Sequence, residues 1–157
     1  MIKAMQTKYF LVVLCLFCTS MGFTQNKLFD KYADMDNVTS VHISKTMLKM
    51  MPKIETAGVN LMNLKGKVES LVLVSTENKN KKKQMKKDFS KSVTSRRLQE
   101  LMRVKDNNRR VSFYSDSQDD RIKELLMLIE NNTAFMAILL VGDFTLKDIQ
   151  EIAEKKE

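Results

Sequence analysis

The chain contains few of the residues on which metal, cofactor and disulfide chemistry depend. Its 157 residues include four glycines, one proline, two cysteines and a single histidine. So little glycine and proline excludes a collagen-like repeat or a proline-rich linker, and four scattered glycines cannot build a phosphate-cradling loop. One histidine, His42, cannot form a multi-histidine metal site. We therefore expect neither a metal site nor a cofactor.

Familiar catalytic motifs are also missing. The sequence has no Walker loop and no GxGxxG, GxSxG or HExxH pattern, each of which positions a phosphate, a nucleotide, a nucleophile or a zinc ion. His42 lies between Val41 and Ile43 in a β-branched segment, which favours an ordinary strand residue over a catalyst. The aspartates of residues 116–120 lack the glycine and terminal glutamate of a calcium loop. We interpret them as a solvated loop and name no catalytic residue.

Methionines gather in one part of the chain, at Met47, Met50, Met51 and Met62. Their thioethers could bind Cu(I) in an oxidising compartment. The helical spacing of the first three favours core packing instead, because methionine fills irregular gaps in a core. We predict that these side chains face inward.

The first 24 residues have the three parts of a secretory signal peptide. Lys3 and Lys8 precede an apolar run over residues 9–18, and small residues follow up to Thr24. The run is too short to span a bilayer, which takes about 20 residues. We predict cleavage after Thr24, which would leave Gln25 as the new N-terminus of a periplasmic or envelope-associated protein.

Both cysteines, Cys15 and Cys18, fall inside this segment. The mature chain would therefore hold no thiol, which excludes disulfides, zinc thiolates and cysteine nucleophiles. The cysteines could instead attach lipid. That alternative is disfavoured because Leu14 and Phe17 stand where a lipobox has a small residue. The remaining residues, 25–157, are enough for one domain with one core.

Positive charge is concentrated in the middle of the chain. Residues 79–110 hold 13 basic and three acidic residues, whereas the whole sequence has a formal net charge of +8. The densest part contains Lys79, Lys81, Lys82, Lys83, Lys86 and Lys87. We take these six lysines as the candidate binding residues.

The lysine run allows three interpretations. It could be a solvated helix surface, a contact with an anionic membrane surface or lipopolysaccharide phosphates, or a nucleic-acid site. A signal peptide removes the protein from nucleic acid, and the basic segment offers only Phe89 for stacking on bases. We therefore expect an envelope protein or an anionic membrane surface as partner, and the oligomeric state stays open.

Local patterns predict an alternation of helices and strands. In the first half of the chain we expect a short helix near residues 28–35, a strand over 38–44, a helix capped by Ser44 and ended by Pro52, a loop over 56–67 pinned by Leu61 and Leu64, and a strand over 68–75. A long helix then runs from the lysines to Leu101 or Met102, and a turn at Asn107-Asn108 leads into a strand over 111–114. The chain ends with a hairpin of residues 122–129 and 134–141 and a last helix capped by Thr145 and Asp148, with Leu146 and Ile149 inward. This order predicts an α+β fold: one mixed sheet of about five strands with helices packed on a face, a two-layer sandwich.

Three stretches of the chain resemble a known family. They are LFDKYADMDNVTSVHISKTMLKMMP at residues 28–52, LMRVKD at 101–106, and ELLMLIE with ILLVGDFTLKDI within 124–149. They are similar to the domain-of-unknown-function family numbered forty-two fifty-two, small exported envelope proteins mostly from Bacteroidota. The resemblance implies a compact α+β domain, and the family's association with extracytoplasmic sigma-factor systems implies envelope stress or signalling. It supplies no catalytic or ligand-binding residues.

These observations leave three functions open. We favour a non-enzymatic envelope module for binding or signalling that acts through its basic helix surface or its sheet. The alternatives are an envelope enzyme with a dispersed site of carboxylates or His42, and a structural subunit of an envelope assembly, which would expose a broad apolar patch.

Overall fold

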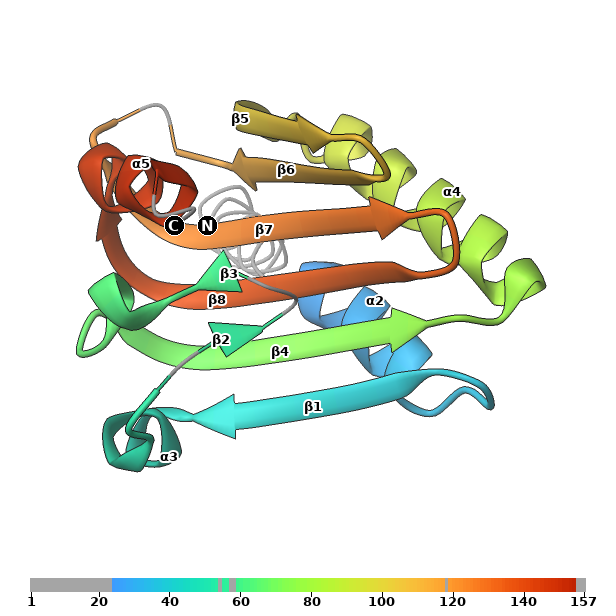
Figure 1. The fold of residues 1–157 in the computed structure, drawn as a ribbon, viewed down its shortest axis with the longest axis horizontal. Helices are drawn as coiled ribbons and strands as arrows, with labels where there is room; N and C mark the ends of the chain where they lie inside the picture. Colours follow the sequence, from blue (N-terminus) through green and yellow to red (C-terminus); the bar gives the residue numbers. More distant parts are fainter. Residues whose placement is uncertain (1–23, 54, 57–58, 118, 155–157) are drawn as a thin grey trace, which may run out of the picture.

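The fold is built on one large antiparallel sheet (Figure 1). The computed structural model describes residues 24–53, 55–56, 59–117 and 119–154. Its helices are α2 (Thr24–Ala33), α3 (Lys45–Met50), the 3-10 turn η1 (Met62–Leu64), α4 (Lys79–Ser95) and α5 (Leu146–Glu154). Its strands are β1 (Thr39–Ser44), β2 (Glu55–Thr56), β3 (Val59–Asn60), β4 (Val68–Thr76), β5 (Gln99–Asp106), β6 (Arg109–Ser115), β7 (Arg121–Asn131) and β8 (Phe135–Thr145).

Six of these strands form the main sheet in the order β1-β4-β8-β7-β6-β5. Every neighbouring pair is antiparallel, and β2 pairs with β3 in a separate small sheet. The predicted α+β class with one main sheet is therefore confirmed. The predicted mixed pairing and strand number of about five are corrected to six antiparallel strands.

The sixth strand comes from a stretch that the sequence analysis assigned to the long helix. That helix, α4, ends at Ser95 and does not reach Leu101 or Met102. Arg97 has a φ of +53°, its N–H bonds to the carbonyl of Thr94, and the N–H of Leu98 bonds to that of Val93. This pair of bonds is a Schellman helix ending. Glycine is the usual residue at its left-handed position, so an arginine there does not indicate from the sequence that the helix ends. The chain then continues as β5.

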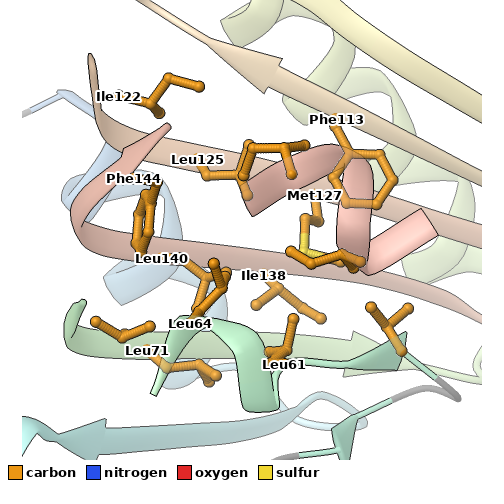
Figure 2. Packing of buried hydrophobic residues seen from close by; sticks show 14 of the residues in the cluster. Leu61, Leu64, Leu71, Phe113, Ile122, Leu125, Met127, Ile138, Leu140 and Phe144 are labelled. Carbon is orange, nitrogen blue, oxygen red and sulfur yellow. The ribbon is translucent and has the colours of Figure 1, made fainter. Parts of the chain in front are cut away.

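Helical elements cover both faces of the sheet, so there are three layers and not the predicted two. Along β4 and β8 the side chains alternate between two cores, as the pleat requires. One core packs under α2 and α4 and contains Phe29, Tyr32, Val74, Met85, Phe89, Leu126, Phe135, Ala137 and Leu139. The other lies under α3, β3, η1 and α5, and Figure 2 shows Leu61 and Leu64 over Leu71, Ile138 and Leu140.

Most local predictions agree with the structure. Ser44 caps α3, its side chain accepting a bond from the N–H of Met47, and Pro52 follows the end of that helix. Asn107-Asn108 joins β5 to β6, and the predicted hairpin is β7–β8. Leu61 and Leu64 are fully buried, as expected.

Three predicted core residues are exposed instead. Met47, Met50 and Leu146 are 53%, 72% and 39% exposed. Helix α3 has six residues and one buried side chain, Leu48. It sits beyond the end of edge strand β1 (Figure 1), so part of its apolar face has no layer to pack against. The core interpretation of Met47 and Met50 is therefore wrong.

The predicted signal peptide lies outside the described residues except for Thr24, where α2 begins. Its cleavage stays a prediction. Among the helices that the structure describes, none is both long and apolar enough to cross a bilayer.

Candidate functional site

The six candidate lysines all lie on α4, but they do not share one surface. Lys79, Lys82, Lys83 and Lys86 follow the spacing i, i+3, i+4, i+7, which places them along one flank of the helix. Lys81 points the other way, toward the turn that follows α2, with its Nζ 3.7 Å from the sulfur of Met35. Lys87 is exposed and acts electrostatically on Asp88.

The four-lysine flank faces the tips of two hairpins across three adjoining hollows. The largest, about 540 Å³, lies between α4, the β5–β6 tip and the β7–β8 turn. The others, about 410 and 190 Å³, extend along the helix and toward the strand surface. Lys86 and Glu130 line all three hollows. We call this combined feature the basic groove.

The groove lining is strongly cationic. Its basic residues are Lys79, Lys82, Lys83, Lys86, Arg103, Lys105, Arg109 and Arg110, and its acidic residues are Glu77, Asp106 and Glu130. The residues predicted for the site did not include Arg103, Lys105, Arg109 or Arg110. The signal for them was present, because the basic excess extends to Arg110 and the turn at Asn107-Asn108 was predicted.

Two lysines hold the groove together. The Nζ of Lys82 donates hydrogen bonds to the main-chain oxygens of Asn131 and Asn132, at 2.5 and 3.1 Å. The Nζ of Lys86 lies 2.8 Å from Oε1 of Glu130. These contacts fix α4 against the β7–β8 turn, so Lys82 and Lys86 form a wall of the groove.

Other cations in the groove are available to a ligand. Within the described part of the chain, Lys79, Lys83, Lys105 and Arg110 make no ion pair, and all four side chains are exposed. Arg103, by contrast, pairs with Glu100. Uncompensated cations around a concave surface attract anions and raise their local concentration.

Comparison with known protein families identifies most of this domain. The family model for the Domain of unknown function (DUF4252) matches residues 32–152. The chain belongs to this family. The resemblance noticed in the sequence is thereby confirmed. No curated protein and no solved structure is detectably similar to the chain. The DUF4252 match includes the whole basic groove.

The remaining candidates of this DUF4252 chain do not converge on a site. His42 is exposed on β1, at the opposite edge of the sheet from β5. Asp116, Asp119 and Asp120 are exposed in the loop before β7. The described residues contain no cluster of three or more His, Cys, Asp or Glu side chains suited to a metal ion. Neither group lines the basic groove.

Another charged cluster, around Asp88, attaches a helix to the fold. Asp88 on α4 accepts hydrogen bonds from Lys31 at 2.8 Å and from the hydroxyl of Tyr32 at 2.6 Å, both on α2. Burial raises the pKa of Asp88, but these two hydrogen bonds outweigh it and lower that pKa below its usual value. Burial and the Asp88 bond raise the pKa of Tyr32. This cluster joins α2 to α4.

Proposed function

We propose that the protein is an exported, non-enzymatic binding module of the cell envelope, and that it holds an acidic segment of a partner protein in the basic groove. The observation that carries the proposal is the convergence of α4 with the β5–β6 tip. It brings Lys79 and Lys83 into the same groove as Lys105 and Arg110, from segments separated in sequence.

The shape and composition of the groove favour a polypeptide segment over a bilayer surface. Helices that bind membranes combine cations with large apolar side chains that enter the lipid. The exposed large hydrophobic residues of the described chain are Val41, Met47, Met50 and Leu146, and none of them lines the groove. Asparagine side chains at both hairpin tips add hydrogen-bonding groups suited to a peptide backbone.

A pair of charge-matched variants tests the proposal. Lys79→Gln, Lys83→Gln and Arg110→Gln together remove three exposed groove cations. Lys27→Gln, Lys91→Gln and Lys147→Gln remove the same charge from exposed positions that do not line the groove. Binding of a fluorescent oligoglutamate peptide and of vesicles with anionic phospholipid is measured for both variants and the unaltered protein, at low and at physiological ionic strength.

We expect the groove variant to bind the peptide at least about tenfold more weakly, since each lost near contact is worth roughly 0.5–1 kcal/mol. The control variant should bind nearly as the unaltered protein does. Equal loss in both variants would show that only net charge matters, which contradicts a groove site. Binding to vesicles without binding to the peptide would replace the protein partner with a membrane surface.

A separate measurement tests export and the cleavage of the signal peptide. Mass spectrometry of the protein purified from the envelope fraction of an expressing cell should find Gln25 at the N-terminus. An uncleaved chain in the cytoplasm would contradict the envelope location.

A further inference from the structure

The two edges of the main sheet are constructed differently. At one edge, β5 carries charged side chains that include Glu100, Arg103 and Lys105, and its register with β6 shifts between Glu100 and Met102. Charges and bulges of this kind stop an edge strand from pairing with another chain. The β5 edge is therefore protected.

The other edge lacks both protections. β1 reads Thr-Ser-Val-His-Ile-Ser and has no Lys, Arg, Asp or Glu. Its pairing with β4 runs without interruption from Thr39 opposite Ser75 to Ser44 opposite Ser70. A regular, uncharged edge strand offers an unblocked row of backbone groups to a further strand.

Apolar exposure is concentrated at this same edge. Three of the four exposed large hydrophobic residues of the described chain are Val41, Met47 and Met50, all within ten residues of sequence. Val41 pairs with Leu73, so it lies on the sheet face that η1 and α5 cover. A strand added at β1 would cover the outer side of Val41 and extend that apolar face.

Charge at the two ends of β1 indicates what would add there. Asp34 and Asp36 precede the strand, and Lys45 and Lys49 follow it, all exposed. When two copies of β1 run antiparallel about a two-fold axis, the start of one strand lies beside the end of the other. In a register centred on Val41, the turn that holds Asp36 in one copy lies at the first turn of α3, which holds Lys45, in the other. Within the described residues, the only ion pair that Lys45 makes is a loose, exposed one with Glu69 at 3.7 Å.

We propose that β1 is a self-association interface, through which two copies of this chain pair antiparallel and continue one sheet across the dimer. Val41 meets Val41 at the centre, and the acidic and basic ends complement each other on both sides. Arg103 and Lys105 lie on β5, at the opposite edge of each copy's sheet, about 24 Å from the β1 interface across five strand spacings. Screening at physiological salt therefore removes most of the repulsion between the β5 strands of the two copies.

Sedimentation velocity over a range of protein concentrations tests this interface. The sample is the full gene product purified from expressing cells, so that the chain is studied in its natural processed form. We expect the unaltered protein to double its mass as concentration rises. Val41→Lys places two like charges opposite each other, and it should weaken dimerisation by about tenfold or more. Gln99→Lys adds the same charge at the β5 edge and should leave dimerisation unchanged.

Exchanging the charges of Asp36 and Lys45 tests the register. Recovery in the double variant also distinguishes a weakened interface from a misfolded protein. Asp36→Lys alone and Lys45→Asp alone should each weaken the dimer, and the double variant should recover it. Circular dichroism should show the same fold for every variant. A protein that stays monomeric at all concentrations, or a Val41→Lys variant that dimerises as well as the unaltered chain, would overturn the proposal. Failure of the double variant to recover would overturn the register centred on Val41.

Discussion

The side chains of Lys86 and Glu130 form an ion pair of 2.8 Å that joins α4 to β7 at the centre of the basic groove. Glu130 is the one acidic residue that lines all three hollows, and its side chain is 25% exposed. It therefore opposes the binding of an anion while it positions a cation. Its removal separates these two effects.

Glu130→Gln should strengthen binding of an oligoglutamate peptide by about two- to fivefold. The change removes a repelling charge and releases Lys86 to the ligand, effects together worth roughly 0.5–1 kcal/mol. Because the Lys86 side chain is half exposed and that of Glu130 is a quarter exposed, the free energy of unfolding should change by less than about 1 kcal/mol. Peptide affinity and urea unfolding measure the two quantities. Weaker peptide binding in the variant would contradict a ligand site in this groove.

Gly142 should tolerate no side chain. A Cβ at this position would collide with the main-chain oxygen of Lys67 and lie 2.7 Å from the ring of Phe144, beside the hydrogen bond from the N–H of Asp143 to that same oxygen. Gly142→Ala should cost about 2–4 kcal/mol in urea unfolding. Gly66→Ala is the control, since open space surrounds it and only its φ of +89° resists the change. It should cost about 1–2 kcal/mol. Equal costs would show that the contact at Gly142 relaxes.

Asp148 should make stability depend on acid pH. Its Oδ2 accepts bonds from the N–H and hydroxyl of Thr145, and its Oδ1 accepts one from Lys67 at 2.6 Å. Burial raises the pKa of Asp148, but the bonds from Lys67 and Thr145 outweigh it and lower that pKa. A depressed carboxyl pKa stabilises the fold above the unfolded value of about 3.9, and this contribution is lost as pH falls through the folded value.

Asp148→Asn should therefore destabilise the protein by about 1–2 kcal/mol at neutral pH. The difference from the unaltered protein should shrink as the pH falls below about 4. Urea unfolding at a series of pH values measures this, with Asp34→Asn as a control at an exposed position. A difference that stays constant down to the lowest pH would mean that the carboxylate charge is not the stabilising element.

The buried leucine of η1 should stabilise the fold far more than the exposed methionines of α3. Leu64 is fully buried, whereas Met50 is 72% exposed. Leu64→Ala should cost about 2–5 kcal/mol, and Met50→Ala less than about 0.5 kcal/mol. Thermal or urea unfolding compares them. A large loss in Met50→Ala for the monomeric protein would restore the core assignment that its helical spacing suggested.

Elements with short-range signals were predictable from the sequence. Ser44 and Thr145 cap their helices through bonds to residues three positions on, and Asn107-Asn108 closes a two-residue hairpin. The end of α4 was not predictable, because Arg97 adopts a conformation that glycine usually signals. Met47 shows the other limit, since periodicity identifies an apolar face but not whether a layer exists to cover it.

The basic groove was predictable as a charge excess but not as a site. Its wall depends on Lys82 reaching the carbonyls of Asn131 and Asn132, nearly fifty residues away in sequence. It also depends on the path of α4, which follows β4 and leads to β5 at the far edge of the sheet. Both are tertiary relationships that no local pattern contains, so the division of the lysines between two flanks appeared only in the structure.

The most direct test of the account is an NMR titration of the isotope-labelled protein with an oligoglutamate peptide. A ligand in the basic groove should shift the backbone amide signals of Asn107, Asn108 and Asn132, which lie at the two hairpin tips. Signals from α5 and from β1 should stay in place, and added salt should reverse the shifts. Shifts confined to surfaces outside the groove, or no saturable shifts at low salt, would contradict the proposed anion-binding role.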